Sequence, residues 1–403
     1  MKHLRKDFPI LEQELNGYPL IYFDSAATSQ RPKQVVDSLV EFYTKFNSNI
    51  HRSVHAFSEQ ATGMFESARQ KVAEFIGAQD TSEIIFTRGT TESLNFVAAT
   101  WGMKHIGSGD EILLTEMEHH ANLIPWQQVA QKNGATLKFI PITENGSLDL
   151  SKLSDLISDK TKLVAITHAS NVLGTHVDVE RIAKEARKVG AKMCVDAAQT
   201  SPHQKLDVKK LDCDFMAFSG HKMLAPTGIG VLYIKKELHD EIPPYHFGGG
   251  MVFEVDFDKA SWQMPPYKFE SGTPAIAQVV GLGAAIDYYN DKVNFEEAQK
   301  YESELTTQAL EGLQQMEKVK ILGPVDELKK SGHLATFVVD GMHSHDVAAY
   351  LSNFGLCTRA GHHCAQPLAK KLGVISSVRA SFMFYNTPQE VDEFLRMMRE
   401  MKL

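Results

Sequence analysis

The stretch FSGHKMLAPTGIGVLYIKK, residues 218–236, joins two apolar strand patterns through a polar turn. The first pattern ends in the turn that carries Lys222, and the second begins near Gly230. A lysine in such a turn is either a solvated surface residue or an amine held at the base of a pocket. Gly228 and Gly230 predict that the backbone turns back tightly beside Lys222.

Apolar strand patterns alternate with helical patterns through the first two thirds of the chain. The strand patterns are EIIFTRG, EILLTEME, LKFIPI, KLVAITHASN and KMCVDAAQ, followed by the two that flank Lys222. The helical patterns between them include NLIPWQQVAQKNG and VERIAKEARKVG. This alternation predicts βαβ units and therefore an α/β fold with a largely parallel sheet covered by helices. Ligands of such sheets bind beyond the carboxyl ends of the strands.

The last third of the chain has a different pattern. Glycine-rich and proline-rich loops follow Phe247, and a long helical pattern then runs from about Ala275 to Met316. Shorter strands and helices complete the chain, which predicts a smaller α+β domain. We therefore expect an N-terminal arm at residues 1–20 that associates with the small domain. The large domain spans residues 21–275, and the small domain spans residues 276–403.

Composition excludes several function classes. The chain has 403 residues, of which 43% are hydrophobic, enough for one large core and a smaller second core. It has 42 basic and 50 acidic residues and no basic block, so we expect no nucleic-acid partner. No apolar run approaches the roughly 20 residues that span a bilayer, and the charged N-terminus does not resemble a signal peptide. We therefore expect a cytoplasmic protein without a membrane partner.

The four cysteines differ in their surroundings. None forms a CxxC pair, so the sequence predicts neither a metal site nor a disulfide framework. Cys194, Cys213 and Cys357 lie in or beside apolar strand patterns, which favours small core residues. Cys364 lies instead in the polar segment AGHHCAQPL, where we expect an accessible thiol.

Two strand ends carry groups that suit pyridoxal phosphate. Asp196 ends one apolar strand, Gln199 follows it, and Lys222 follows another strand. Asp196 alone would be interpreted as a helix cap or turn residue. Together with a lysine it matches the needs of pyridoxal phosphate, which binds a lysine amine and requires an acid beside its pyridine nitrogen.

A phosphate and a flat ring would also find partners. In TRGTTESLNF a turn leads to Thr90 and Thr91, which open a helix whose N-terminus suits a phosphate. The alternative is ordinary threonine capping. Ser219 and His221 could add donors to the same anion. His119 in EMEHHAN could stack on the ring, although a histidine pair alone is more often an ordinary loop feature.

In order along the chain, these motifs resemble the cysteine desulfurases of fold-type I, most closely the SufS-like group II enzymes. The resemblance covers essentially the whole length. The motifs are YFDSAATSQRP, NSNIHRSVH, TRGTTESLN, EMEHHANLIPWQ, ASNVLGT, VDAAQ, FSGHKMLAPTGIGVLY, FESGTP and RAGHHCAQPL. The short loop around Cys364 is similar to group II and unlike the longer loop of the IscS-like group.

The resemblance implies a seven-stranded sheet, a homodimer and a role for each motif residue. It assigns Lys222 as the lysine that binds pyridoxal phosphate covalently and takes up the substrate Cα proton. It assigns Cys364 as the persulfide carrier and His119 as the ring-stacking residue and a proton handler. The residues assigned to the cofactor are Lys222, Asp196, Gln199, His119, Thr90, Thr91, Ser219, His221 and, across the dimer, Thr273. Those assigned to the substrate are Arg379, Asn171, Ala27 and, as a second choice for the carboxylate, Arg359.

The resemblance implies conversion of L-cysteine to L-alanine, with the sulfur passed to a SufE-like or SufU-like acceptor protein for iron–sulfur cluster assembly. L-selenocysteine would fit the same pocket, so a selenocysteine lyase stays open. A class V aminotransferase would need no thiol at Cys364, and a non-catalytic scaffold would need none of the set. His345 could contact a partner's zinc, but an ordinary helix start capped by Ser344, with Asp346 in the first turn, is slightly favoured.

Overall fold

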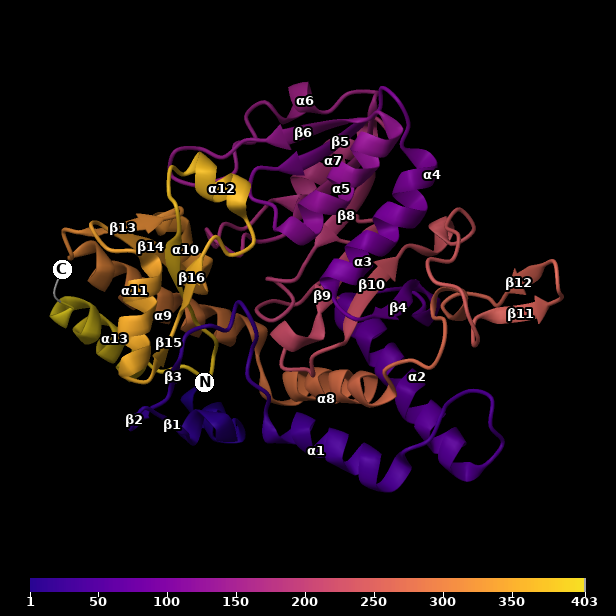
Figure 1. The fold of residues 1–403 in the computed structure, drawn as a ribbon, viewed down its shortest axis with the longest axis horizontal. Coiled ribbons are helices and arrows are strands. Elements are labelled where there is room, and N and C mark those ends of the chain that lie inside the picture. The colour runs from indigo at the N-terminus through magenta and orange to yellow at the C-terminus, as the bar shows by residue number, and fades with distance from the viewer. Residues whose placement is uncertain (402–403) are drawn as a thin grey trace.

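The computed structural model describes residues 1–401 and contains a central sheet of seven strands. Only β10 runs antiparallel to its neighbours, and the other strands are mutually parallel (Figure 1). This confirms the predicted α/β fold with a mainly parallel seven-stranded sheet. In spatial order the strands are β4 (Ile84–Thr87), β10 (Gly230–Ile234), β9 (Phe215–Ser219), β8 (Lys192–Asp196), β7 (Thr161–Thr167), β5 (Glu111–Thr115) and β6 (Thr136–Ile140).

Helices cover both faces of this sheet, which explains why its strands read as continuous apolar runs. Along β5, Ile112 and Leu114 pack toward one face while Leu113 packs toward the other. The first face is covered by α3 (Thr90–Val97), α4 (Met103–His105) and α5 (His120–Asn133). The second face is covered by α2 (Ala56–Ile76), α7 (Val179–Lys188) and α8 (Ile276–Lys292).

The single long helix expected from Ala275 to Met316 is wrong. The chain instead forms α8 and α9 (Phe295–Gln314), and the Asn294 side chain caps α9 by accepting a hydrogen bond from the Glu297 amide at 3.1 Å. Helix α8 packs against α1 (Lys33–Glu41) and α2, whereas α9 packs against α10 (Val325–Ser331) and α13 (Pro388–Glu400). The apolar faces of α8 and α9 therefore pack in different layers of the molecule.

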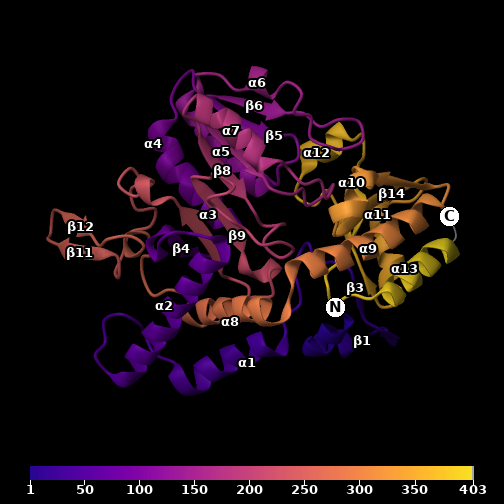
Figure 2. The same ribbon diagram turned by 180° about the vertical axis from the view of Figure 1, so that it is seen from behind.

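A second, antiparallel sheet lies in the C-terminal part of the chain (Figures 1 and 2). Its strands, in spatial order, are β13 (Val319–Leu322), β14 (Leu334–Val339), β17 (Ser377–Ser381) and β16 (Arg359–Gly361). The predicted boundary between the large and small domains, after residue 275, stays a prediction. Helix α8, which that boundary assigns to the small domain, packs with the helices that cover the first sheet. The last residues of the predicted small domain, 402–403, lie outside the described residues.

The remaining elements are short and connect or flank the two sheets. A parallel pair of β3 (Ile21–Tyr22) and β15 (Leu356–Cys357) joins the N-terminal segment to the C-terminal part. No helix among residues 1–401 has the length and apolar character needed to cross a bilayer. The other α-helices and strands are β1 (Glu14–Leu15), β2 (Tyr18–Pro19), α6 (Leu153–Leu156), β11 (Val252–Val255), β12 (Ala260–Trp262), α11 (Ser344–Asn353) and α12 (Gln366–Lys371).

The start of α11 differs from the predicted cap. The His343 ring caps the helix by accepting a hydrogen bond from the His345 amide at 3.3 Å. The Ser344 hydroxyl instead donates to Ser376 at 2.6 Å. The predicted cap is therefore one residue off, while Asp346 does lie in the first turn. His345 is exposed and is not needed to cap the helix.

The cysteine predictions hold with one exception. Cys194 and Cys213 are buried, as expected of core residues, and Cys364 is exposed. Cys357 lies in the short strand β15, as expected, but it is only partly buried.

Several buried histidines lie close together between the central sheet and the C-terminal sheet. The His203 and His333 rings stack with their centroids 4.0 Å apart, and His203 Nδ1 lies 2.8 Å from a Glu302 oxygen. Burial lowers the pKa of His168 to about 3 and that of His176 to about 4, and it lowers the pKa of His333 well below its ordinary value. These three rings are therefore neutral in the folded protein at neutral pH.

The neutral histidines predict that stability falls on acidification. In the unfolded chain each imidazole regains a pKa near 6.5, so the unfolded state binds more protons below that pH. Each uncoupled histidine then removes up to about 1.4 kcal/mol of unfolding free energy per pH unit between about pH 6.5 and its folded pKa. Urea unfolding midpoints between pH 7.5 and 5 measure this slope.

A matched pair of variants assigns the slope to the buried cluster. His333→Asn should flatten the pH dependence by about one proton, because one buried titrating group is removed. His3→Asn, at an exposed position, should leave the slope as it is. Equal slopes in all three proteins would contradict the assignment.

Candidate active site

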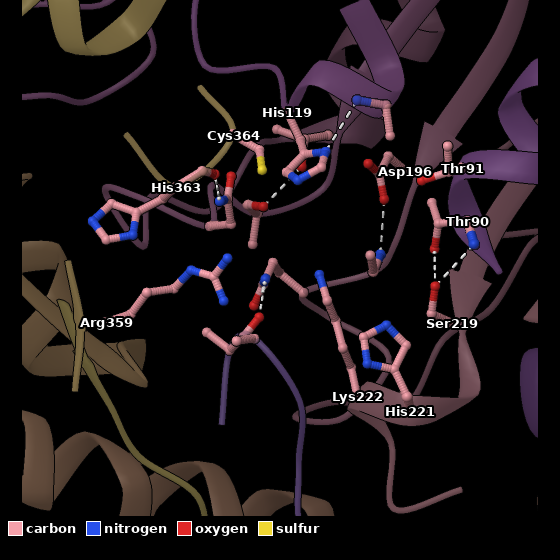
Figure 3. A pocket seen from close by; sticks show the side chains of 18 of the residues that line it. Thr90, Thr91, His119, Asp196, Ser219, His221, Lys222, Arg359, His363 and Cys364 are labelled. Atoms are coloured by element: carbon pink, nitrogen blue, oxygen red, sulfur yellow. Dashed lines mark hydrogen bonds between the residues drawn. The ribbon is translucent and has the colours of Figure 1, made fainter. Parts of the chain in front are cut away.

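A cavity lies beyond the carboxyl ends of the central strands, between the two sheets' layers (Figure 3). Residues from both parts of the chain line it, and all but one of the predicted site residues meet there. Thr273 is the exception, because it lines a separate cavity together with Asn49, His51 and Arg52. The predicted residues that line the main cavity are Ala27, Thr90, Thr91, His119, Asn171, Asp196, Gln199, Ser219, His221, Lys222, Arg359, Cys364 and Arg379.

Lys222 and Asp196 approach the cavity from neighbouring strands. Asp196 ends β8 and pairs in register with Ala217 of β9, and the turn after β9 carries Lys222. The Lys222 amine points into the cavity (Figure 3). Burial lowers the pKa of Lys222 to about 8, against the attraction of Asp196 and with the help of Arg379. This amine therefore loses its proton, and becomes nucleophilic, far more easily than an ordinary lysine.

The polar groups around Asp196 are incompletely paired. Its Oδ1 accepts a hydrogen bond from the Ala198 amide at 3.0 Å, and burial raises the carboxyl pKa. The amide nitrogen of Gln199 donates to the Ala26 carbonyl at 2.9 Å, whereas its buried oxygen has no partner among residues 1–401. A buried carboxylate and an open amide oxygen suit a cationic ring N–H and a further polar ligand atom, as a pyridinium cofactor provides.

The N-terminus of α3 forms the anion-binding end of the cavity. Gly89 is the N-cap residue, and no side chain caps the helix, so the alternative of threonine capping is wrong. The Thr90 amide instead donates to the Ser219 hydroxyl at 2.8 Å, and the two hydroxyls lie 2.7 Å apart. With Thr91 and His221 beside them, these groups match the donors that a phosphate requires.

The two glycines of the opening stretch serve different purposes. Gly228 has φ +77°, a left-handed conformation that forms the turn. Gly230 is the first residue of β10, and a Cβ placed on it would lie 2.4 Å from the Gly89 Cα. Gly230 is therefore required by close approach to the anion-binding turn rather than by the turn that follows Lys222.

His119 is held in one orientation and one tautomer. It is the N-cap of α5, and its Nδ1 accepts a hydrogen bond from the Ala121 amide at 3.0 Å. Burial, followed by the neighbouring Lys222, lowers the pKa of His119 to about 4. The ring is therefore neutral and carries its proton on Nε2, where it can act as a hydrogen-bond donor.

Arg379 is a buried cation with one unpartnered nitrogen. Its guanidinium donates to the Asn171 carbonyl at 2.8 Å and to Asp24 at 3.3 Å, while its Nε has no partner among the described residues. Burial lowers the pKa of Arg379 to about 10, so it stays charged at neutral pH. Arg359 on β16 lies directly opposite Arg379 on β17. The two cations favour a carboxylate between them.

The segment around Cys364, which we name the sulfur loop (residues 361–366), is tied to the rest of the site through its backbone. The Asn171 side chain donates to the His363 carbonyl at 2.7 Å, and the His120 amide donates to the Cys364 carbonyl at 2.8 Å. Figure 3 shows Cys364 above the cavity, on the side away from Lys222.

Comparisons with known proteins agree with this geometry. Residues 21–394 match the aminotransferase class-V family. The chain is 49% identical over 399 residues to a probable cysteine desulfurase of Halalkalibacterium halodurans, covering 99% of this chain and 97% of that protein. It is 50% identical over 397 residues to one of Staphylococcus aureus, covering 98% and 95%.

Two solved structures extend the match to the fold. The apo cysteine desulfurase of Thermococcus onnurineus NA1 superposes with a TM-score of 0.93 at 45% identity, covering 99% of this chain and 97% of that one. The cysteine desulfurase CsdA of Escherichia coli gives a TM-score of 0.91 at 39% identity, covering 98% and 97%. The chain belongs to the class-V aminotransferase family, among its cysteine desulfurases.

Three residues in or beside this desulfurase's site escaped the sequence analysis. Asp24 binds Arg379 and follows the apolar β3, which was a usable signal. His363 is buried beside Cys364, and its Nε2 lies 3.1 Å from the Ser377 hydroxyl. Glu118 precedes His119 and is fully buried, which raises its carboxyl pKa to about 7. The sequence does not distinguish His363 from its neighbour His362, or Glu118 from its neighbour Glu116.

The close approach at Gly230 predicts a difference between two alanine variants of this desulfurase. Gly230→Ala should unseat the α3 turn, with an unfolding cost of about 1–3 kcal/mol and a large loss of affinity for added pyridoxal phosphate. Gly228→Ala should cost only about 1 kcal/mol, because its Cβ meets nothing within 4 Å and only the left-handed φ is strained. Thermal unfolding and cofactor titration by absorbance check this, and equal cofactor affinity in the two variants would contradict it.

Proposed function

We propose that this cysteine desulfurase binds pyridoxal phosphate through Lys222 and converts L-cysteine to L-alanine, leaving the sulfur as a persulfide on Cys364. The observation that carries the proposal is that the Lys222 amine and the Cys364 thiol open into one cavity, with Arg379 in the same lining. An aminotransferase needs the amine and the cation but has no use for the thiol. The arrangement therefore favours removal of sulfur over transfer of an amino group.

The residues of the cavity fit the cofactor group by group. Asp196 would hold the ring nitrogen in its protonated form, and His119 would lie against the ring. The N-terminus of α3, with Ser219 and His221, would receive the phosphate. When bound, the cofactor supplies an electron sink that stabilises negative charge at the substrate Cα.

The chain's own groups then perform the proton and sulfur transfers. Arg379, with Arg359 beside it, binds the substrate carboxylate. The neutral Lys222 amine accepts the Cα proton. The Cys364 thiolate forms an S–S bond to the substrate sulfur while the Cβ–S bond breaks, and that bond's electron pair stays with Cβ. The S–H proton of the new persulfide then passes to Cβ, and the Lys222 ammonium returns its proton to Cα, which completes alanine. The neutral His119 ring, whose Nδ1 is held by the Ala121 amide, donates a hydrogen bond from Nε2 in the same cavity while these protons move.

The persulfide must then be transferred before another turnover. We propose that a nucleophile of a SufU-type or SufE-type acceptor protein takes the terminal sulfur, in the service of iron–sulfur cluster assembly. Cys364 is exposed, as this transfer requires. His345 is also exposed, so contact between it and an acceptor's zinc stays a proposal, as does a cytoplasmic location.

We also propose that the enzyme is a homodimer. The hairpin of β11 and β12 projects from the body and exposes Phe253 at 79% and Phe257 fully (Figure 1). Thr273 lies outside the main cavity, in a second cavity near the base of that hairpin. A second subunit that covers the apolar hairpin would bring Thr273 toward the partner's phosphate, as the family resemblance implies.

The dimer predicts that charges on the hairpin will separate the subunits. Phe253→Lys combined with Phe257→Lys should shift the mass in light scattering from dimer to monomer, because buried unpaired charges oppose association. Ile375→Lys is the control, since Ile375 is an equally exposed apolar residue, at 82%, in the C-terminal part. A dimer that survives the hairpin changes would overturn the proposed interface.

The mechanism predicts different losses for two variants in alanine formation from L-cysteine with a reductant present. Lys222→Ala should abolish activity, by a factor of at least about 10³, because it removes both the cofactor anchor and the base. Cys364→Ser should lose persulfide and nearly all alanine while keeping the cofactor's absorbance. If Cys364→Ser forms alanine at the normal rate, Cys364 is not the sulfur carrier and a selenocysteine lyase becomes the better proposal.

A further inference from the structure

His120 contacts the sulfur loop twice, from the first turn of α5. Its backbone amide donates to the Cys364 carbonyl at 2.8 Å. Its ring Nε2 accepts a hydrogen bond from the Gln366 amide at 3.2 Å. The two bonds reach Cys364 and Gln366, on either side of Ala365. One residue beside the first sheet therefore fixes the backbone of residues 364–366.

The loop needs such a grip because its backbone is strained. His363 has φ +52° and Cys364 has φ +57°, both in the left-handed region. For residues other than glycine this conformation costs roughly 1–2 kcal/mol each, and it persists only where the surroundings hold it. Apart from His120, the hold on this pair from the first sheet's layer is the bond from Asn171 to the His363 carbonyl.

The neighbouring tie is of a different kind. Lys371 on α12 pairs with Glu116 after β5 at 3.1 Å, and the Lys371 side chain is half exposed. An exposed pair of this kind contributes little, commonly less than about 1 kcal/mol. Lys371 also lies five residues beyond Gln366, so this ion pair positions α12 rather than the Cys364 backbone.

We propose that His120 is a positioning residue that holds the Cys364 thiol toward the cavity through the hydrogen bond at its ring Nε2. This inference rests on the proposed function for the meaning of the thiol, but the hydrogen bond itself can be tested without it. The bond from the His120 backbone amide to Cys364 does not depend on the side chain. The ring bond is the part that a side chain can remove or replace.

Three variants separate the ring bond from the bulk of the ring. His120→Ala removes the acceptor. His120→Gln restores it, because the Gln oxygen lies as many bonds from Cβ as the imidazole Nε2 does. His120→Asn keeps a polar side chain but places its oxygen one bond too short, so it serves as a second loss variant should the alanine variant fold poorly. Lys371→Ala is the matched control on α12.

The first readout is hydrogen exchange of the sulfur loop in the holoenzyme. Peptides that span residues 361–369 should exchange several-fold faster in His120→Ala and His120→Asn than in the wild type, because the Gln366 amide has lost its acceptor. His120→Gln and Lys371→Ala should match the wild type. Unchanged exchange in both loss variants, or equal exchange in His120→Gln and His120→Ala, would overturn the proposal.

The second readout is the split between kcat and KM for alanine formation. The loss variants should lower kcat about five- to tenfold, the effect expected of one lost hydrogen bond, with KM for cysteine and the absorbance of the bound cofactor unchanged. His120→Gln should recover most of kcat. A loss of cofactor absorbance in every variant would instead mark a structural role and contradict positioning.

The two readouts distinguish this inference from the proposed function. If wild-type protein forms no alanine while the loop exchanges as described, the proposed function fails and the grip on the loop stands. If alanine forms normally in His120→Ala and loop exchange is unaltered, the proposed function stands and the positioning role fails.

Discussion

The burial of two oppositely charged groups, Asp196 and Lys222, in one cavity is the constraint on which the rest of this structure depends. Two opposite charges lie at the ends of adjacent strands inside the protein, where charges are costly unless they are paired. Burial lowers the pKa of Lys222 to about 8 and raises that of Asp196, so each group is pushed toward its neutral form. A bound pyridinium changes this balance, because it gives the carboxylate a cation and uses the amine. The site is therefore an incomplete electrostatic arrangement that its cofactor completes.

This constraint also explains the position of the site in the fold. The carboxyl ends of parallel strands meet at one edge of a sheet, so β8 and β9 bring Asp196 and Lys222 together without long loops. The antiparallel β10 then returns past Gly89, and only glycine at position 230 permits that approach. Anion-binding turn, lysine turn and carboxylate are thus parts of one strand arrangement. A change in any of them is transmitted to the others through the backbone rather than through flexible side chains.

Sequence reasoning succeeded where local pattern decides structure. The strands with apolar runs, the parallel sheet and the strand-end polar residues followed from periodicity and from the alternation of elements. It failed where tertiary packing decides. At Asn294 a single helical pattern ends one helix, α8, and begins another, α9, because the two helices pack against different parts of the molecule. It also could not place Asp24 beside Arg379, since 355 positions separate them and only the pairing of both ends of the chain joins them. Roles carried by the family resemblance, such as that of Thr273, depend on a second subunit that one chain cannot contain.

The sulfur loop shows why the site is assembled from two layers instead of one. Under the proposed function, the thiol meets a substrate inside the cavity and later an acceptor outside it, which a rigid strand would not allow. It also cannot sit on a free loop, because misplacement by about 1 Å can slow a reaction by about a hundredfold. A strained loop held by a few hydrogen bonds from the opposite layer satisfies both needs. The left-handed residues cost free energy, and the hydrogen bonds from His120 and Asn171 offset that cost, so the loop is held by contacts from the opposite layer rather than by its own backbone preference.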